Sequence, residues 1–179
     1  MSELTIDAIY ASNEEIRMRL KKTAGSITDE QANALPDGEK WTIAQLFEHI
    51  SMVDEGIGKI CNKLLQQAEA EGKLFDGSVK LSDAFLERSG EIANLRVEAP
   101  ERVQPTGEKT IAESMAVLDE NRIRLNDIKA LFETFDGNEF TFPHPFFGEI
   151  SAVEWLRLLG GHEARHTRQI EALMAKINS

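Results

Sequence analysis

The strongest constraint on the fold is a helix-start signal that recurs along the chain. A Ser or Thr followed three residues later by Glu or Gln can form a capping box. In this arrangement the hydroxyl caps one backbone N–H and the longer side chain reaches back to another. The signal occurs at Thr28…Gln31, Thr42…Gln45, Thr110…Glu113 and Ser151…Glu154. Pro36-Asp37-Gly38 interrupts the chain soon after the first signal, so we expect a short turn there and long helices after the other three.

Apolar residues recur at steps of three and four in long segments, which is the pattern of amphipathic helices. The segments span roughly residues 3–24, 42–70, 110–135 and 151–177. They lack the sustained heptad seam of a coiled coil, and the sequence contains no convincing alternation of the kind expected for β-strands. The pattern therefore predicts an all-α fold, a four-helix bundle.

Two of the predicted connections are longer than most helix–helix turns. Residues 72–109 form a long crossover between the second and third helices, with a short helical stretch near 82–90. Residues 136–150 form a proline-bracketed loop before the fourth helix. We expect both to shape a pocket. The chain has 179 residues and no repeat or linker that would divide it, so we predict a single domain over 1–179.

Charge and composition limit the classes of partner and the cellular location that we expect for this chain. The chain has 20 Lys and Arg against 31 Asp and Glu, a net charge of −11, which disfavours nucleic acids and anionic membranes. Apolar runs fall short of the roughly 18 residues that span a bilayer. The start, Met1-Ser2-Glu3-Leu4, lacks the order of a signal peptide, and Cys61 is the single cysteine. We expect a cytoplasmic protein.

Three of the four histidines interrupt apolar stripes. His162 and His166 are four residues apart, so they share one helix face, and His49 lies on or beside the stripe of another helix. Imidazoles at this spacing can share one cation, and a third ligand from a second helix would complete a site that keeps a position open for water or substrate. Zn, Ni, Cu and Fe all suit three imidazoles. Hydrogen-bonded core histidines are the alternative.

The segment His162-Glu163-Ala164-Arg165-His166 also matches the H-E-x-x-H signature of metalloproteases. That mechanism needs a further ligand, and Glu171 is displaced by about 140° around the helix from His166, so it cannot join the same cation. We therefore reject a protease and expect Glu163 to be solvated or to support the ligands. Gly160 and Gly161 precede the pair, which is consistent with a close approach of another backbone or a ligand.

Further polar residues are candidates for the pocket or the core. Arg122 interrupts the third helix and would either hold a substrate anion or bridge a buried carboxylate, the second being favoured. His144, between two prolines, would overhang the pocket, and Gln169 shares the face of His166 and could support it. We expect Asn13 to be a hydrogen-bonded interior amide and Cys61 to be an inert core thiol.

Two segments resemble the DinB/YfiT-like family, in its DinB_2-type branch. Residues 41–50 are similar to its Trp-Ser/Thr-x-x-x-x-x-x-His segment, and residues 162–170 to its His-x-x-x-His-x-x-Gln-Ile segment. The resemblance extends over essentially the whole chain. It implies a four-helix bundle with an up-down-down-up order and a divalent metal site at His49, His162 and His166.

The resemblance also implies a range of activities, because characterised relatives are thiol-dependent S-transferases or isomerases and metal-dependent hydrolases. We expect a zinc or nickel enzyme that activates water or a thiol for hydrolysis or thiol transfer on a small molecule, with a low-molecular-weight thiol as a candidate substrate. The alternatives are a non-catalytic binding or stress-response sensing module and a purely structural bundle. Exposed bundle faces are compatible with a homodimer.

Overall fold

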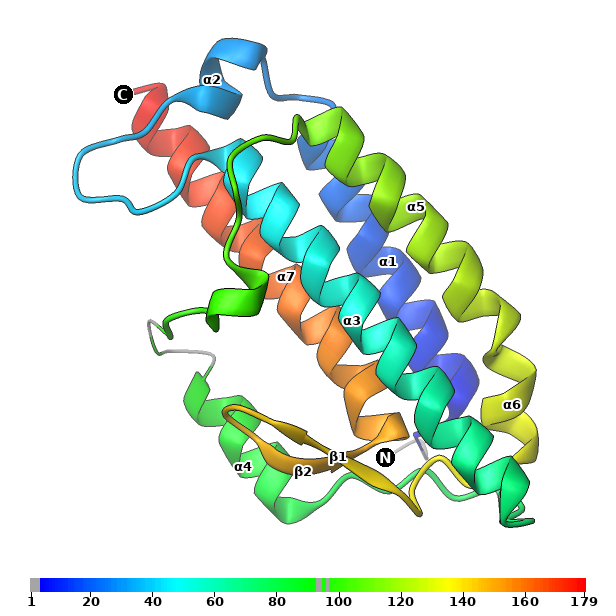
Figure 1. Cartoon of the computed structure of the whole chain (residues 1–179). Helices are drawn as coiled ribbons and strands as arrows, with labels where there is room; N and C mark the ends of the chain where they lie inside the picture. Colours follow the sequence, from blue (N-terminus) through cyan, green and yellow to red (C-terminus); the bar gives the residue numbers. More distant parts are fainter. Residues whose placement is uncertain (1–3, 93–94, 96) are drawn as a thin grey trace.

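The computed structural model describes residues 4–92, 95 and 97–179. Its long helices are α1 (Ile6–Ala24), α3 (Ile43–Ala70), α5 (Ile111–Asp127) and α7 (Ala152–Ile177). In Figure 1, α1 and α7 run upward and α3 and α5 run downward, which confirms the expected up-down-down-up bundle. Helix α7 packs against α1 and α3, and α3 also packs against α5. The first residue of the predicted first helix, at position 3, lies outside the described residues.

The capping boxes place the helix starts as predicted. In each of the four, the Ser or Thr hydroxyl accepts a backbone N–H and the Glu or Gln side chain accepts the N–H of the cap residue. The first opens only the short helix α2 (Asp29–Asn33), as expected from the break that follows. Among the residues described, no helix is both long enough and apolar enough to cross a membrane.

The interior has two apolar clusters separated by a layer of buried charge. Leu46, Leu118 and Ile170 belong to one cluster, and Ile57 and Leu156 belong to the other. Between them, each long helix contributes one charged side chain to the layer, namely Arg17, Asp54, Arg122 and Glu163.

Arg17 organises this charged layer. Its Nε and Nη2 donate to the two carboxylate oxygens of Glu163 at 2.9 and 2.6 Å, and Nη2 also lies 3.2 Å from Oδ1 of Asp54. Arg122 Nη2 is 3.8 Å from Glu163. Glu163 is only 1% exposed, so the expectation that it is solvated is wrong. A buried carboxylate requires this kind of pairing because an isolated buried charge is very costly.

Two elements differ from the sequence prediction. A β-hairpin of β1 (Thr141–His144) and β2 (Gly148–Ser151), with Thr141 opposite Ser151, lies in the stretch predicted to be a loop. Its strands are too short to show a clear alternation. The predicted third helix ends early at Asp127 and is followed by α6 (Lys129–Thr134). The break falls at Ile128, whose backbone (φ −92°, ψ 2°) departs from the helix, and the Tyr10 hydroxyl donates to the nearby carbonyl of Leu125 at 2.8 Å.

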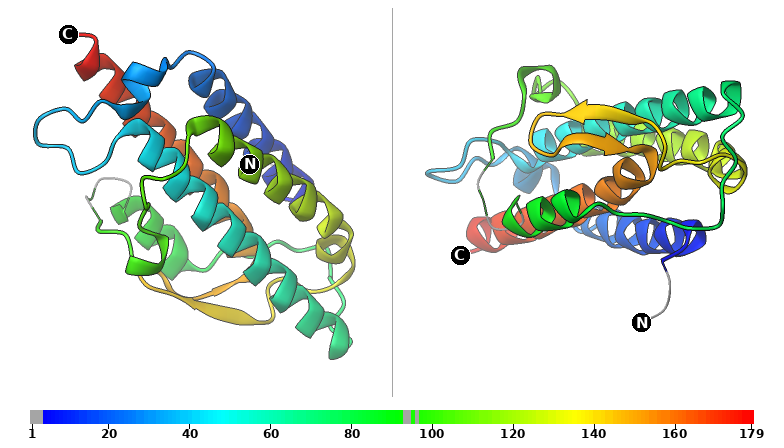
Figure 2. Two further views of the ribbon diagram at one scale, coloured as in Figure 1. Left: turned by 45° about the horizontal axis from the view of Figure 1, so that its top comes forward. Right: turned by 90° about the horizontal axis from the view of Figure 1, so that it is seen from below.

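The long crossover covers one face of the bundle. It contains α4 (Asp83–Ile92), close to the predicted helical stretch, and a 3₁₀ helix, η1 (Glu101–Val103). In Figures 1 and 2, α4, η1 and the hairpin lie over the face that α3 and α7 present. These connections therefore form walls around that face, as expected for pocket-forming segments.

Candidate metal centre and its cavity

Three histidines converge where α3 and α7 face each other. His49 comes from α3, and His162 and His166 come from successive turns of α7. One ligand atom from each lies within 4.8 Å of the other two, and the Nε2 atoms of His49 and His162 are 3.1 Å apart. His49 and His166 are buried, and His162 is half-buried. The structure thus brings together the three residues that the sequence singled out; that they bind a metal stays a prediction.

Two of these imidazoles are oriented by partners on their outer nitrogens. His49 Nδ1 is 2.7 Å from the carbonyl oxygen of Val103 in η1, and His166 Nδ1 is 2.9 Å from Oε1 of Gln169. Both oxygens can only accept, so each Nδ1 donates its hydrogen. A neutral imidazole then has a free lone pair on Nε2, the atom available to a cation. Gln169 therefore supports His166, as the sequence suggested.

The surroundings keep all three imidazoles unprotonated. Burial is the largest effect and lowers the pKa of each, to about 3 for His166. The positive charge of Arg165 lowers the pKa values further. Because a metal binds the unprotonated form, a proton competes weakly for these nitrogens near neutral pH.

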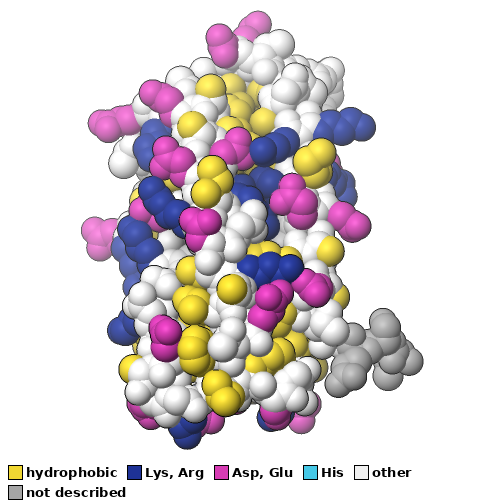
Figure 3. Space-filling view, turned by 90° about the vertical axis from the view of Figure 1, so that its right-hand side faces the viewer, with side chains coloured by type: hydrophobic (Ala, Val, Ile, Leu, Met, Phe, Trp, Pro, Cys, Tyr) yellow, Lys and Arg dark blue, Asp and Glu magenta, His cyan; other side chains and the backbone are white. Residues whose placement is uncertain are grey.

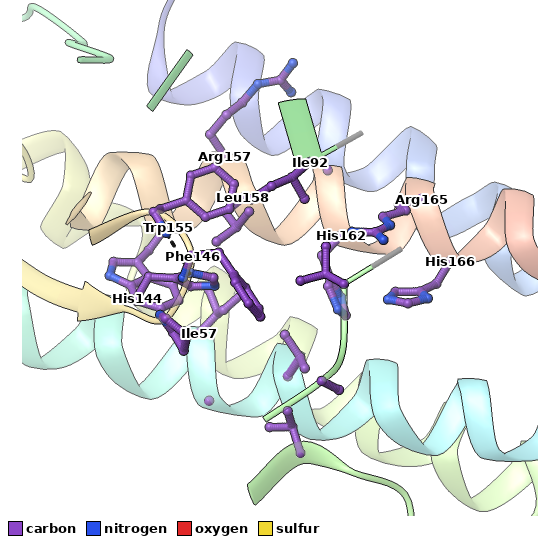
Figure 4. Close-up of a pocket in the computed structure, with 18 of the residues that line it drawn as sticks. Ile57, Ile92, His144, Phe146, Trp155, Arg157, Leu158, His162, Arg165 and His166 are labelled. Carbon is purple, nitrogen blue, oxygen red and sulfur yellow. Dashed lines mark hydrogen bonds between the residues drawn. The ribbon is translucent and has the colours of Figure 1, made fainter. Parts of the chain in front are cut away.

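A cavity of about 850 Å³ extends along the α3–α7 face and includes the three histidines in its lining. Figure 4 shows the part of it that contains His162 and His166. This volume is in the range of small-molecule pockets. Its walls are largely apolar and come from α3, α4, the hairpin and α7, including Ile57, Ile60, Phe85, Phe147 and Leu158. Trp41 and Trp155, the two tryptophans of the chain, also line it.

His144 lines the cavity on the hairpin side. Its Nδ1 accepts the backbone N–H groups of Phe146 and Phe147 at 3.1 and 3.3 Å. Burial and the charge of Arg102 lower its pKa to about 4. The ring is therefore neutral near pH 7 and carries its hydrogen on Nε2, so it can donate a hydrogen bond but is a poor proton acceptor.

Arg122, a pocket candidate from the sequence, does not line the cavity. It belongs to the charged layer, where Nη2 donates to the carbonyl of Asn13 at 3.3 Å. This placement agrees with the structural role that was favoured for it. Gln169 is likewise outside the cavity lining and acts through His166.

Two expected core residues fit their predicted roles in different degrees. Cys61 is buried, and burial raises the pKa of its thiol, consistent with an inert core residue. Asn13 Nδ2 donates to the carbonyl of Leu156 at 2.9 Å, but its Oδ1 has no partner among the described residues. The expectation of a satisfied amide is therefore correct for only half of this side chain.

The charged layer was missed by the sequence analysis although its positions carry a signal. Arg17 lies three residues before the buried Leu20, and Asp54 lies between Ile50 and Ile57 at steps of four and three. Charged residues at such positions interrupt an apolar stripe in the same way as the histidines. These interruptions in α1 and α3 are the signal from which an internal ion pair could have been predicted.

With its four-helix bundle and three histidines beside a cavity, the protein falls into the class of helical bundles with a candidate metal site. The chain belongs to the DinB superfamily, whose family model matches residues 13–170. It is 26% identical over 164 residues to the uncharacterized protein YuaE of Bacillus subtilis (strain 168), covering 91% of this chain and 95% of that protein. The family expected from the sequence is therefore confirmed.

The fold also matches a solved structure. TT2238, described as a four-helix bundle protein, aligns with a TM-score of 0.63 and 24% identity, covering 94% of this chain and 99% of TT2238. This likeness supports the four-helix bundle architecture.

Proposed function

We propose that the protein is a metal-dependent enzyme in which His49, His162 and His166 hold a divalent ion, zinc or nickel. The reaction would be hydrolysis or thiol transfer on a small molecule, with a low-molecular-weight thiol as a candidate second substrate. The observation that carries this proposal is the convergence of three unprotonated imidazoles within 4.8 Å of one another, in the lining of a cavity.

The donor set fits a divalent cation. Val103 and Gln169 fix the hydrogens of His49 and His166 on Nδ1, so two Nε2 lone pairs are available in the cluster. The 3.1 Å between the Nε2 atoms of His49 and His162 requires a hydrogen or a cation to offset their repulsion. A bound divalent ion would supply Lewis acidity that lowers the pKa of water or a thiol to near neutrality.

The cavity contributes orientation and water exclusion. Its apolar walls cover the body of a substrate, and the Nε2–H of His144 is available to donate to a substrate oxygen. His144 is unsuited to act as a general base because its pKa is lowered to about 4 and its Nδ1 is occupied. Activation of the nucleophile would therefore depend on the divalent ion that the three histidines would hold.

A non-catalytic binding or sensing module is the second candidate. It is favoured by one observation: of the described side chains that line the cavity, the carboxylates are engaged, Glu55 with Lys59 and Glu98 with Lys40. A site without a free base could bind a ligand without turnover. Incubating metal-loaded protein with thiol and ester libraries separates the two, because only the enzyme consumes a substrate.

The metal proposal is tested on protein purified without a histidine tag. We expect close to one zinc or nickel ion per chain by mass spectrometry of the metal, or on titration with either ion. The His162→Ala/His166→Ala variant should lose this binding. His144→Ala is the matched control because it removes a histidine from the same cavity but outside the cluster.

Metal retained in the double variant would contradict the assignment of the ligands. Wild-type protein that takes up neither of these ions, nor copper or iron, would exclude the metal site. In that case the three histidines would be hydrogen-bonded core residues.

A further inference from the structure

The arginines of the described chain fall into two groups. Five take part in ion pairs with carboxylates: Arg17, Arg19, Arg88, Arg122 and Arg124. The remaining four described arginines have no ion pair with any described residue, and all four line the cavity: Arg102, Arg157, Arg165 and Arg168. The arginines without a carboxylate partner are thus concentrated at one place.

This concentration is unusual for such an acidic chain. With 31 Asp and Glu against 20 Lys and Arg, carboxylates are in excess over the cations. Figure 3 shows acidic and basic side chains interspersed over another face of the molecule. The carboxylates in the cavity lining do not neutralise the arginines, because Glu55 pairs with Lys59 at 2.6 Å and Glu98 with Lys40 at 2.5 Å. The cavity therefore has an uncompensated positive charge.

The arginines come from two elements that line the cavity, α7 and η1. Arg157, Arg165 and Arg168 are spaced by eight and three residues on α7, so they form one stripe beside that of the histidines. Figure 4 shows Arg165 beside the cluster and Arg157 towards the other end, its guanidinium directed away from the histidines. Arg102 comes from η1, next to the Val103 carbonyl that His49 contacts.

Arg165 and Arg102 retain most of their hydrogen-bonding capacity. Arg165 is half-buried and uses Nη2 to donate to the carbonyl of Leu95 at 2.6 Å. Arg102 is exposed and makes no hydrogen bond with the described residues. A guanidinium has five N–H donors, and it binds planar or tetrahedral anions better than neutral groups. An anion between these two side chains would satisfy donors that the protein leaves open.

We propose that the cavity binds an anionic amphiphile, a small molecule with an apolar body and a carboxylate or phosphate group. The anionic group lies between Arg165 and Arg102, beside the histidine cluster, and the apolar body lies along Ile57, Ile60 and Leu158 towards Trp155. This inference names the substrate class for the proposed function and rests on that function only for which end of the molecule reacts.

The test uses the two cavity tryptophans as an internal probe of binding. Metal-free protein is titrated with decanoate, decyl phosphate, decanol and decyltrimethylammonium while Trp fluorescence is recorded. These ligands share a ten-carbon body and differ in the head group. We expect at least one anion to bind about tenfold or more tightly than decanol, with the cation weakest and the preference reduced by salt. The two anions distinguish a carboxylate from a phosphate as the preferred head group.

The arginine assignment is tested with Arg102→Gln/Arg165→Gln, compared with Lys22→Gln/Arg124→Gln, which makes the same change in net charge outside the cavity. The first variant should lose the preference for anions and keep its affinity for decanol, and the second should keep the preference. Arg102→Gln alone should reduce the preference; its side chain is exposed and has no ion pair with any described residue, so the substitution should leave folding intact.

Equal binding of decanoate, decyl phosphate and decanol to wild type would overturn the proposal, as would an anion preference that survives in Arg102→Gln/Arg165→Gln. The measurement contains no metal, so its failure leaves the metal proposal standing. Conversely, protein that takes up no metal can still show the anion preference.

Discussion

Gly160 and Gly161 are adjacent in α7 but have opposite surroundings. A Cβ on Gly160 would lie 2.1 Å from Oδ1 of Asn13, and the Asn13 side chain is fully buried and held by the Leu156 carbonyl. At Gly161 a Cβ would have nothing within 4 Å. The first glycine is therefore required for the packing of α1 on α7, and the second leaves room on the cavity side.

The two glycines give a matched pair of variants. Gly160→Ala should destabilise the protein by about 1–3 kcal/mol, because Asn13 must move in a packed interior. Gly161→Ala should be neutral or stabilising by up to about 1 kcal/mol, because Ala favours the helix and meets no neighbour. Urea denaturation of both variants measures the difference. Similar free energies of unfolding for the two would show that Asn13 does not restrict position 160.

For individual residues, the sequence predicted part of the site. The spacing of His162 and His166 placed them on one face. The close approach expected at the two glycines occurs only at Gly160, where it comes from the Asn13 side chain and not from a backbone. Glu163 was misjudged because its partner, Arg17, is 146 residues away, and a single sequence does not show which stripe positions meet. The unpaired arginines were missed for the same reason: pairing becomes visible only when distant helices are placed.

Among the elements, the start of α7 and the start of α4 depend on one carboxylate. Glu154 accepts the backbone N–H of Ser151 at 2.9 Å on one oxygen and the N–H and hydroxyl of Ser82 at 2.8 and 2.6 Å on the other. Ser82 in turn accepts the N–H of Phe85 at 3.2 Å. The capping box of α7 therefore also positions α4, which carries Phe85 into the cavity wall.

Replacing this carboxylate should cost more than replacing its counterpart in α5. Glu154→Ala should lower the free energy of unfolding by roughly 2–4 kcal/mol, because the carboxylate is buried and three donors lose their acceptor, among them the N–H of the buried Ser151. Glu113→Ala removes the same capping interaction at an exposed site and should cost about 1 kcal/mol or less. Hydrogen exchange of residues 83–92 should accelerate in the first variant only. Unchanged exchange in Glu154→Ala would mean that α4 is held by packing alone.

Helix starts were the most predictable elements because capping is a local interaction between residues three apart. All four boxes form, and α3, α5 and α7 begin directly after their cap residues. The end of α5 was not predicted because apolar spacing continues through Ile128, whose backbone (φ −92°, ψ 2°) ends the helix without a Gly or Pro to mark the position. The hairpin escaped notice because its strands have four residues each.

For the molecule as a whole, the buried charged layer couples stability to pH. Asp54 is surrounded by Arg17, Arg122 and Glu163, and burial together with the Glu163 charge raises its pKa from 3.8 to about 7. An unfolded Asp releases its proton near pH 4, whereas the folded protein retains it until about pH 7. The contribution of Asp54 to stability therefore falls as pH rises from about 4 to about 7. The histidines act oppositely, since their pKa values are lowered by folding.

Asp54→Asn isolates this contribution. Asn cannot ionise and keeps an oxygen that can accept from Arg17. Relative to wild type, the variant should gain stability between pH 4.5 and pH 8, while the histidine contribution cancels in the comparison. Chemical denaturation of both proteins at pH 4.5, 6 and 8 provides the measurement. A difference in stability that does not vary with pH would show that Asp54 is ionised throughout this range.

The connectivity of the bundle followed from the family resemblance rather than from helical periodicity, because periodicity fixes helices but not their directions. α3 and α5 run the same way, so the chain must return along the full length of the bundle between them. That return path is the segment that supplies α4, η1 and Arg102.

The return path has a consequence for how such a protein can diversify. The imidazoles belong to two helices of the bundle, whereas part of the cavity wall, including Phe85, belongs to the crossover. We expect a graft of another segment between residues 71 and 100 to change which molecules bind and to leave the three imidazoles in place, because Val103, whose carbonyl oxygen contacts His49, is kept. The histidine cluster, which would determine the reaction, and the cavity wall, which would select the ligand, could then change independently during evolution.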